Sequence, residues 1–287
     1  MPRANRHYLP GYVWHITHRC HKKEFLLKFA RDQRRWLKWL FEAKKRFGIS
    51  ILNYAITSNH VHLVVWDGKG EDVIPQTMQL IAGRTGQEYN QRKNRKGAFW
   101  EDRYHATAVE ADLHLIECMA SYVDLNMVRA GVVSHPSEWP FCGYQEIQNP
   151  RQRYSLIDDG LMSLLDIKNR DGLKRIYKGW VEEVLGKESS RNRQPRWTES
   201  IAIGNEAFVR ETKEKLGIRA IGREVIGADG SYELRDAETP YGAFFSPPNG
   251  KEAKGAALDK GHIGKGNIIC LRNLSSGRLI AAADLSR

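Results

Sequence analysis

The sequence has 287 residues, which is enough for one sizeable domain and an extension. Its 41% hydrophobic and 28% charged residues are ordinary for a globular protein and argue against disorder through most of the length. Lys and Arg number 45 against 34 Asp and Glu, which leaves a net charge of +11 and a sequence pI near 9.5. Such an excess favours a polyanionic partner such as nucleic acid, although a basic protein that is merely soluble is the plain alternative.

Cysteine usage indicates a reducing compartment. Cys20, Cys118, Cys142 and Cys270 are scattered, with no CxxC pair and no dense framework of the kind found in secreted proteins. No apolar run approaches the roughly 20 residues of a membrane span, and the basic start leads into a short aromatic strand rather than a signal-peptide core. We therefore expect a cytoplasmic protein with no membrane partner.

The first 145 residues alternate between strand and helix patterns. Gly48 is expected to end the first helix, and Asp112 is a plausible cap for the last. The expected strands cover 12–18, 49–56, 61–66 and 100–109, and the expected helices cover 29–47, 73–91 and 112–128. This order fits an α+β fold in which a ferredoxin-like antiparallel sheet has its helices packed on one face.

The composition changes after residue 145 and predicts three parts. Residues 1–145 form the principal domain, and residues 146–245 form a mainly helical C-terminal extension with helices at 161–185 and 199–216. Residues 246–287 are expected to be a flexible tail, because much of this stretch holds too little apolar matter to fold alone.

Two histidines lie on the third expected strand. His60 and His62 alternate with Val61, so both point to the same face, about 7 Å apart along the strand. Two imidazoles placed in this way can share a metal ion. The alternative is a pair of polar residues on a solvated strand face, and an isolated pair is more often that.

A tyrosine and an asparagine lie on the last expected helix. Tyr122 and Asn126 are four residues apart, hence on one side of the helix with a rise of about 6 Å between them. Each also has an ordinary explanation. Tyr122 fits a core aromatic residue on an amphipathic helix, and Asn126 fits a polar residue or cap at the helix end.

Together these side chains supply what phosphodiester cleavage needs. Cleavage requires an oxygen nucleophile, a Lewis acid at the scissile phosphate and donors to the flanking phosphates. A phenol forms a stable phosphotyrosine whose bond energy is retained for religation, which suits strand transfer better than hydrolysis. Two imidazoles and one amide oxygen, from His60, His62 and Asn126, leave open positions on a metal ion, and we expect Mg²⁺ or Mn²⁺.

Five motifs follow one another in the first 145 residues. They are Met1-Pro2-Arg3 with Gly11-Tyr12-Val13-Trp14-His15-Ile16-Thr17 and Arg19, then Thr57-Ser58-Asn59-His60-Val61-His62-Leu63-Val64-Val65, then Phe99-Trp100-Glu101-Asp102-Arg103-Tyr104, then Tyr122-Val123-Asp124-Leu125-Asn126-Met127-Val128-Arg129-Ala130-Gly131, and last Trp139-Pro140-Phe141. In content and order they resemble the REP-associated tyrosine transposases, which belong to the single-tyrosine HUH transposases. Five motifs in this order are far rarer by chance than any one of them.

The resemblance implies an HUH pair at His60 and His62, Tyr122 as the attacking residue and Asn126 as a third metal ligand. It also implies a transposase that cleaves and rejoins single-stranded DNA next to a folded hairpin, giving a 5′-phosphotyrosine and a free 3′-OH. One departure is Met127, where the family commonly has proline, which affects the geometry of the helix end and not the inventory of chemical groups. The resemblance is loose in the extension, so it implies no functional residue there.

The expected partners are single-stranded or hairpin DNA, and a homodimer is compatible with the sequence. A DNA-bound protein of this kind would be associated with the nucleoid. A single strand would lie in a positive groove with aromatic platforms. The candidate contacts are Arg19, Arg92, Lys93, Arg95, Lys96, Trp100, Arg103 and Tyr104. The basic run is as easily explained by a solvated loop, and Arg103 and Arg129 by structural pairing with Glu101 or Asp124.

Two other functions stay open. A histidine-triad nucleotide hydrolase has a pattern close to that around His60 and His62, but its third histidine would fall at Val64, so the imidazole nucleophile is missing. A non-catalytic protein that binds hairpin DNA could keep the fold and the charge without cutting. A covalent adduct with a labelled strand separates the enzyme from a pure binder.

Overall fold

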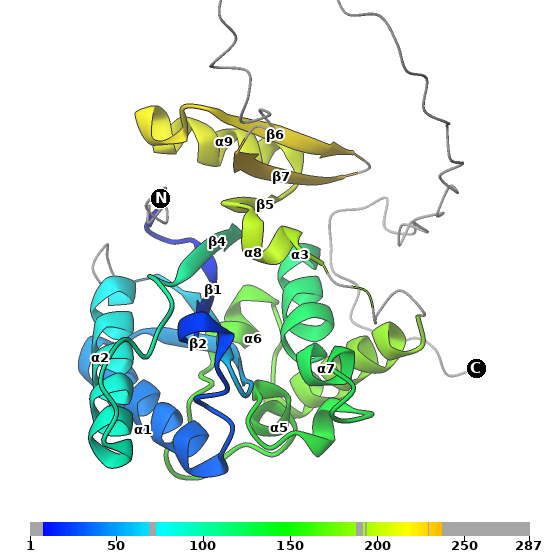
Figure 1. Cartoon of the computed structure of the whole chain (residues 1–287). Coiled ribbons are helices and arrows are strands. Elements are labelled where there is room, and N and C mark those ends of the chain that lie inside the picture. Colours follow the sequence, from blue (N-terminus) through cyan, green and yellow to red (C-terminus); the bar gives the residue numbers. More distant parts are fainter. Residues whose placement is uncertain (1–7, 69–72, 188–191, 193, 229, 237–287) are drawn as a thin grey trace, which may run out of the picture. The chain divides into compact units, whose positions relative to one another are not determined.

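A seven-stranded sheet runs through the described part of the chain in the order β2-β3-β1-β4-β5-β7-β6 (Figure 1). The computed structural model describes residues 8–68, 73–187, 192, 194–228 and 230–236. The strands are β1 (Val13–Arg19), β2 (Ser50–Ile56), β3 (His60–Trp66), β4 (His105–Val109), β5 (Ala202–Gly204), β6 (Arg223–Ala228) and β7 (Ser231–Asp236). Among the described strands only β4 and β5 pair in parallel, so this is the mainly antiparallel α+β fold that the sequence predicts.

The first four strands have the ferredoxin-like order. β1 lies between β3 and β4, and β2 pairs with β3 as the predicted hairpin. The turn of this hairpin is held by Thr57, whose hydroxyl oxygen accepts hydrogen bonds from the backbone N–H groups of Asn59 and His60 at 3.3 and 3.1 Å. These local hydrogen bonds set the point at which the histidine-bearing strand begins.

Two long helices pack side by side on one face of the sheet (Figure 1). They are α1 (Ala30–Phe47) and α2 (Val73–Lys93). Gly48 ends α1 in the left-handed conformation, with φ at 70°, as its position in the sequence predicts. Trp100 joins α2 to the sheet, because its indole is stacked on His18 of β1 and donates to the backbone carbonyl of Ala82 at 3.1 Å.

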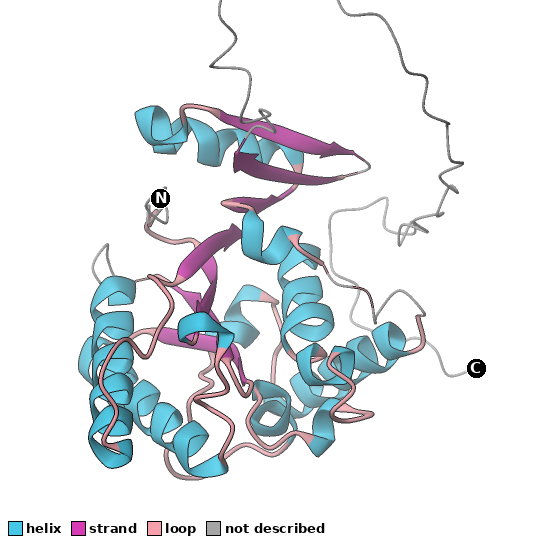
Figure 2. Cartoon of the chain, in the orientation of Figure 1, coloured by secondary structure: helices cyan, strands magenta, loops and turns pink. Residues whose placement is uncertain are grey.

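The opposite face of the sheet is also covered by helices, which Figure 2 shows on both sides of the strands. This cover is needed because Val13 and Val64 on that face are as deeply buried as Ile16 and Leu63 on the other. The prediction that the helices pack on one face of the sheet is therefore correct for α1 and α2 and wrong for the helices that cover the opposite face. The remaining helices of the principal domain and the extension are α3 (Leu113–Ile116), η2 (Glu117–Val123), α4 (Asn126–Arg129), α5 (Gly143–Gln148), α6 (Gly160–Leu164), α7 (Arg170–Leu185), α8 (Arg196–Glu199) and α9 (Glu206–Leu216), with short 3-10 turns η1 (His21–Lys23), η3 (Pro136–Glu138) and η5 (Gly217–Ala220).

The helix expected at 112–128 is interrupted. Asp112 caps its first turn as predicted, since its carboxylate accepts from the backbone N–H of His114 at 2.8 Å. The chain then widens into the π-helical turn η2, in which the N–H of Asp124 donates to the carbonyl of Met119, five residues earlier, at 3.0 Å. Tyr122 thus lies in the last part of a π-helical turn that ends at Val123, and Asn126 begins the separate helix α4. Such turns often occur at functional sites.

The extension adds three strands that the sequence analysis did not predict. β5 pairs with β4 and is followed by α9, and then β6 and β7 complete the sheet.

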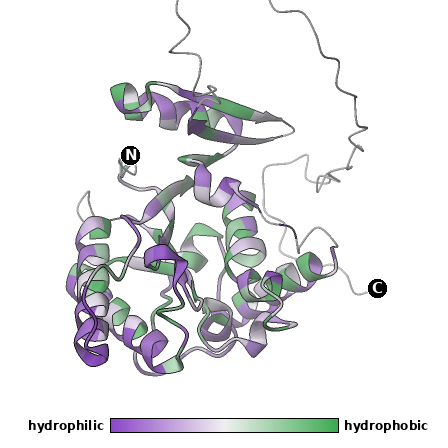
Figure 3. Ribbon diagram, in the orientation of Figure 1, coloured by the Kyte–Doolittle hydropathy of each residue, from purple (hydrophilic) through white to green (hydrophobic). Residues whose placement is uncertain are grey.

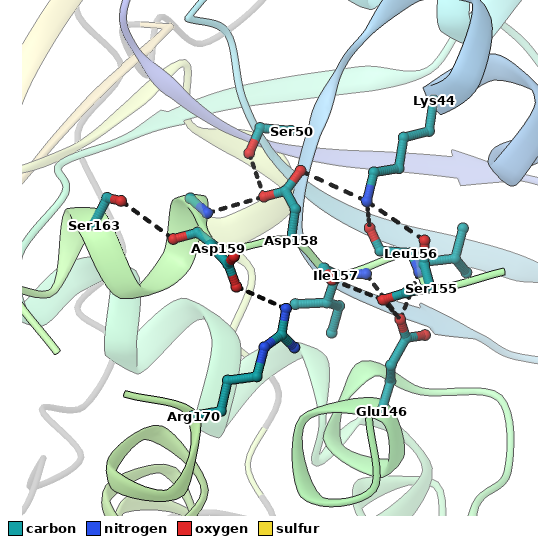
Figure 4. A network of polar contacts seen from close by, with 11 residues as sticks. Lys44, Ser50, Glu146, Ser155, Leu156, Ile157, Asp158, Asp159, Ser163 and Arg170 are labelled. Atoms are coloured by element: carbon teal, nitrogen blue, oxygen red, sulfur yellow. Dashed lines mark hydrogen bonds and ion pairs between the residues drawn. The ribbon is translucent and has the colours of Figure 1, made fainter. Parts of the chain in front are cut away.

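A polar network joins the start of the extension to the principal domain (Figure 4). In it, the Glu146 carboxylate accepts from the backbone N–H groups of Leu156 and Ile157 at 2.5 and 2.9 Å, and Lys44 donates to the Leu156 carbonyl at 2.6 Å.

The helices mix hydrophilic and hydrophobic residues along their length, as Figure 3 shows. This is the pattern of helices that cover a core with one face and meet water with the other. No helix in the described ranges is long and apolar enough to cross a membrane.

Candidate active site

A row of polar side chains lies on one face of β1, β3 and β4. Directly opposed residues of antiparallel strands share a face, and the register opposes His62 to Thr17, His60 to Arg19 and His105 to Thr17. This face is the one covered by η2, which contacts both β2 and β3. The two histidines of the predicted pair therefore lie on the face covered by η2 and not on a solvated face, and His62 is only 1% exposed.

His60 is held by the turn that precedes it. Its Nδ1 lies 2.7 Å from the amide oxygen of Asn59 and 2.9 Å from the hydroxyl of Thr57. The Asn59 amide nitrogen donates to the carbonyl of Lys23 at 3.2 Å, which orients its oxygen toward His60. Nδ1 therefore carries the proton, and Nε2 of His60 keeps a lone pair for a metal ion or a donor.

His62 has a partner on each ring nitrogen. Its Nδ1 lies 3.0 Å from Nε2 of His15 in β1, and the amide nitrogen of Asn126 donates to its Nε2 at 3.0 Å. His15 in turn donates from Nδ1 to the backbone carbonyl of Trp197 at 3.0 Å. The rings of His60 and His62 are perpendicular, with centroids 4.9 Å apart.

The three imidazoles are in environments that disfavour their charged forms. Burial lowers the pKa of His60 to about 4, assisted by the positive charges of Arg19 and Arg129. Burial likewise lowers the pKa of His15 to about 3 and that of His62 well below its usual range. These histidines are therefore neutral near pH 7, the state in which an imidazole can bind a metal ion.

Tyr122 lies beside His62 and His15. Its ring centroid is 5.3 Å from that of His62 and 5.5 Å from that of His15, both edge to face, and the residue is 8% exposed. Asn126 contacts the same His62 ring from the next helix. The interruption of the predicted helix thus leaves both residues against His62, although they do not lie one regular turn apart.

Arg129 organises the end of the π-helical turn. Its guanidinium donates to the backbone carbonyl of Ser121 at 2.6 Å and to that of Tyr122, and its centre lies 4.9 Å from the Tyr122 ring centroid. These two carbonyls are among those that a helix end leaves without a backbone donor. Burial lowers the pKa of Arg129 from its usual value, while the neighbouring Tyr122 opposes the shift.

A buried network behind η2 fixes the turn from the other side. The Tyr177 hydroxyl of α7 donates to the Asp124 carboxyl at 2.5 Å and accepts from the Asn53 amide of β2 at 2.9 Å. The backbone N–H of Tyr144 donates to the other Asp124 oxygen at 3.4 Å. Burial raises the pKa of Asp124 to about 7, and the hydrogen bonds from its neighbours oppose that shift.

The predicted nucleophile and metal ligands line one open cleft of about 700 Å³. The cleft brings together side chains from the sheet, the loop after α2, η2, α4 and the extension. Its cations exceed its carboxylates, as a path for phosphates requires. Its lining residues are Thr17, His18, Arg19, Lys23, Asn59, His60, His62, Glu101, Asp102, Arg103, His105, Tyr122, Asn126, Arg129, Ala130, Gln194, Thr198 and Glu199.

The other predicted DNA contacts lie outside this cleft. Arg92 pairs with Asp32, and Arg95 lies 3.4 Å from Glu24, while Lys93 is the last residue of α2 and Lys96 follows in the loop after it. The Trp100 ring is stacked on His18 at 4.0 Å between centroids. Tyr104 is only 5% exposed, which leaves little of its ring for a base. Arg19, which lies 4.0 Å from Glu101, and the exposed Arg103 are the predicted contacts that the structure brings to the histidines.

The donor set of the cleft fits a divalent metal ion. His60 and His62 are neutral and each has Nε2 as its lone-pair nitrogen, and Asn126 contacts Nε2 of His62. A half-turn of the Asn126 amide exchanges its nitrogen for its oxygen, so that an oxygen ligand would face the same space. This mixed nitrogen and oxygen set suits an ion that also binds phosphate oxygens.

A second group of possible metal ligands lies elsewhere. Glu110, Asp112 and His114 have ligand atoms within 4.8 Å of one another. Their contacts have a structural explanation, because Asp112 caps α3 and Glu110 accepts hydrogen bonds from Asn205 at 2.6 Å. This group does not line the cleft.

Three residues of the cleft region were missed by the sequence analysis as functional candidates. His15 and Arg129 stand inside the quoted motifs, and Trp197 stands in the extension. Strand alternation would put His15 on the His62 face once β1 is known to pair with β3. No sequence signal indicates the backbone carbonyl of Trp197.

The fold and the cleft define an α+β protein whose antiparallel sheet carries a basic, histidine-lined site. The family model described as "Transposase IS200 like" matches residues 10–126, which include His60, His62, Tyr122 and Asn126. Over this segment, which is less than half of the chain, the sequence is similar to the IS200-like transposases, in agreement with the family resemblance seen in the motifs.

The solved structures that match the chain are only distantly similar to it. A REP-associated tyrosine transposase bound to a REP hairpin is 17% identical, with a TM-score of 0.44 over 59% of this chain and 94% of that chain. A protein of Deinococcus radiodurans R1 assigned as a transposase is 15% identical, with a TM-score of 0.30 over 37% of this chain and 85% of that chain. Similarity this low carries no functional argument, and no curated protein sequence matches the chain.

Proposed function

We propose that the principal domain is a transposase that cleaves and rejoins single-stranded DNA next to a folded hairpin of the REP type, with Tyr122 as the nucleophile. The observation that carries the proposal is the convergence of Tyr122 and Asn126 on His62, beside His60, in a cleft that also holds four basic side chains. The motif resemblance to REP-associated tyrosine transposases supports the choice of a hairpin-bearing strand.

In the proposed reaction the Tyr122 phenol oxygen attacks phosphorus and the bond from phosphorus to the 3′ oxygen breaks. The strand segment on the 3′ side of the cut stays on the enzyme, joined to Tyr122 through its 5′ phosphate, and the segment on the 5′ side leaves with a free 3′-OH that takes up the proton lost by the phenol. Attack of a 3′-OH on the phosphotyrosine reverses the step and rejoins a strand. Arg129 stabilises negative charge at the Tyr122 ring, and Arg19 and Arg103 attract the phosphates.

A divalent ion, Mg²⁺ or Mn²⁺, held by His60, His62 and Asn126 would supply Lewis-acid stabilisation of the phosphate. The neutral state of both imidazoles and their Nδ1 hydrogen bonds favour this assignment. The remaining contacts expected from the sequence, from the basic run and the two aromatic residues, stay predictions.

The test uses the full chain with end-labelled, hairpin-containing single strands and Mn²⁺, followed by denaturing gels and peptide mass analysis. We expect a covalent adduct on Tyr122 that is lost in Tyr122→Phe and with EDTA. Tyr154→Phe is the matched control, because that side chain is 69% exposed and lies outside the cleft. Cleavage by Tyr122→Phe would exclude Tyr122 as the nucleophile, and binding without an adduct on any hairpin would favour a pure hairpin-binding protein.

A further inference from the structure

We infer that His15 is a positioning residue that fixes the tautomer and orientation of His62 through a hydrogen-bond relay anchored on the Trp197 backbone carbonyl. The relay makes residues 196–199 of the extension part of the site. The relay itself is independent of the proposed function, and its consequence for metal binding rests on that function.

The direction of the relay follows from the atom at its end. A carbonyl oxygen only accepts, so His15 donates to Trp197 from Nδ1 over 3.0 Å. Nε2 of the neutral His15 ring is then an acceptor, and it takes the Nδ1 proton of His62 over 3.0 Å. His62 is left with its lone pair on Nε2, the nitrogen that Asn126 contacts. The reverse order would leave His15 Nδ1 and the carbonyl as two facing acceptors.

The carbonyl that anchors the relay is itself firmly held. Trp197 lies in the four-residue helix α8, where the last carbonyls have no helical N–H partner. The hydroxyl of Thr107 in β4 donates to the carbonyl of Ser200 at 2.7 Å and lies 3.4 Å from that of Trp197. The Trp197 side chain is fully buried, so the sheet fixes this short helix and its carbonyl points at His15.

Ring packing restricts the same side chains. The His15 and His62 rings are nearly parallel, with centroids 5.3 Å apart and an interplanar angle of 9°, which aligns the two ring nitrogens of the relay. The Tyr122 ring is perpendicular to both, and the centroid of the Trp197 ring lies 6.1 Å from that of Tyr122. His15 therefore stands at the centre of the group that sets His62 against Tyr122, although it does not line the cleft.

Two substitutions separate the relay from simple packing. His15→Phe fills much of the space but cannot accept from His62, whose Nδ1 proton then lacks its partner. His15→Gln keeps both functions, since its amide oxygen can accept from His62 while its amide nitrogen donates to Trp197. Loss of an outer partner of a metal-binding histidine typically weakens metal affinity about 10- to 100-fold.

The experiment measures histidine tautomers by long-range ¹H–¹⁵N NMR on the full-length, metal-free protein and Mn²⁺ affinity by calorimetry. We expect Nδ1–H tautomers at His15 and His62 in the wild type. We also expect 10- to 100-fold weaker Mn²⁺ binding in His15→Phe and near wild-type binding in His15→Gln, all at unchanged far-ultraviolet circular dichroism.

An Nε2–H tautomer at His62 in the wild type would overturn the relay, as would a folded His15→Phe that keeps both the tautomer and the affinity. A wild-type protein that has the expected tautomers and binds no Mn²⁺ would instead overturn the metal site of the proposed function and the metal-positioning role of His15 with it. If His15→Phe does not fold, Mn²⁺ binding weakened 10-fold or more in a folded His15→Gln would overturn the relay.

Discussion

Arg129 combines two tasks in a single guanidinium. Its N–H groups satisfy the carbonyls of Ser121 and Tyr122, and its positive charge lies over the Tyr122 ring. A planar fork is suited to such paired contacts, whereas a lysine ammonium is not. In the proposed reaction the same charge would stabilise a phenolate at Tyr122, so we expect this residue to affect both the shape of the turn and the reactivity of its tyrosine.

Removal of that guanidinium should slow formation of the tyrosine adduct. A partly desolvated cation over an aromatic ring contributes about 1 to 2 kcal/mol, which corresponds to roughly tenfold in rate. We expect Arg129→Ala to lower the single-turnover rate by about that factor and Arg129→Lys to fall between Ala and the wild type. Arg153→Ala, at an exposed position outside the cleft, serves as the control. An unchanged rate in a folded Arg129→Ala would contradict this role.

For single residues, the sequence predicts the strand face on which a side chain lies better than it predicts the residue that this side chain contacts. Alternation alone places His60 and His62 on one face, because the period of a strand is local. The contact of His62 with His15 depends on how β1 pairs with β3, and the contact of His15 with Trp197 joins positions 182 residues apart. Neither is encoded in a local pattern, so both appear only in the folded chain.

Between α3 and α4, the π-helical turn is stabilised by tertiary contacts rather than by helix propensity. Asp124 is buried and its carboxyl is held by Tyr177 of α7 and the backbone of Tyr144. A continuous helix is the natural prediction from the apolar spacing of this segment, because the partners that favour the interruption come from later elements. The motif correctly indicated that Tyr122 and Asn126 lie close to His62. It did not predict the π-helical turn that brings them there.

Tyr177→Phe should therefore destabilise the described unit. The substitution leaves the Asp124 carboxyl without its closest donor and the Asn53 amide without its acceptor, both in the interior. An unsatisfied buried polar group costs about 1 to 3 kcal/mol, and we expect a loss of that size in the free energy of unfolding by denaturant. Tyr154→Phe removes a hydroxyl from an exposed tyrosine and should change stability by less than about 0.5 kcal/mol. Equal unfolding midpoints for the two variants would contradict the prediction.

At the scale of the whole described unit, the extension continues the sheet of the principal domain. β5 is only three residues long and pairs with β4 over two positions, too short a signal to be seen as a strand in the sequence. The four strands and the paired helices before residue 110 were predictable because each has its own periodicity. The extension was predicted as mainly helical because its strands acquire their partners only from the completed sheet.

Because the sheet is continuous, we expect the described unit to unfold cooperatively. The exposure of its buried cysteines can be used to measure this unfolding. Cys20, Cys118 and Cys142 are fully buried in three different parts of the principal domain. Burial raises the pKa of Cys20 to about 12 and those of Cys118 and Cys142 above their usual range. Because the thiolate is the reactive form, raising the pH from 7 to 9 should produce little thiolate in the native state, although an exposed thiol ionises across that range.

The measurement follows release of a chromophore from a disulfide reagent at pH 8 along a denaturant series, with EDTA present. The protein carries Cys270→Ser, which removes the one cysteine outside the described residues. We expect almost no reaction in the native state and simultaneous exposure of all three thiols at one denaturant concentration, the signature of cooperative unfolding. Rapid native-state reaction of a single thiol would show that its layer opens alone, and two separate midpoints would show that the sheet and the helices behind Tyr122 unfold independently.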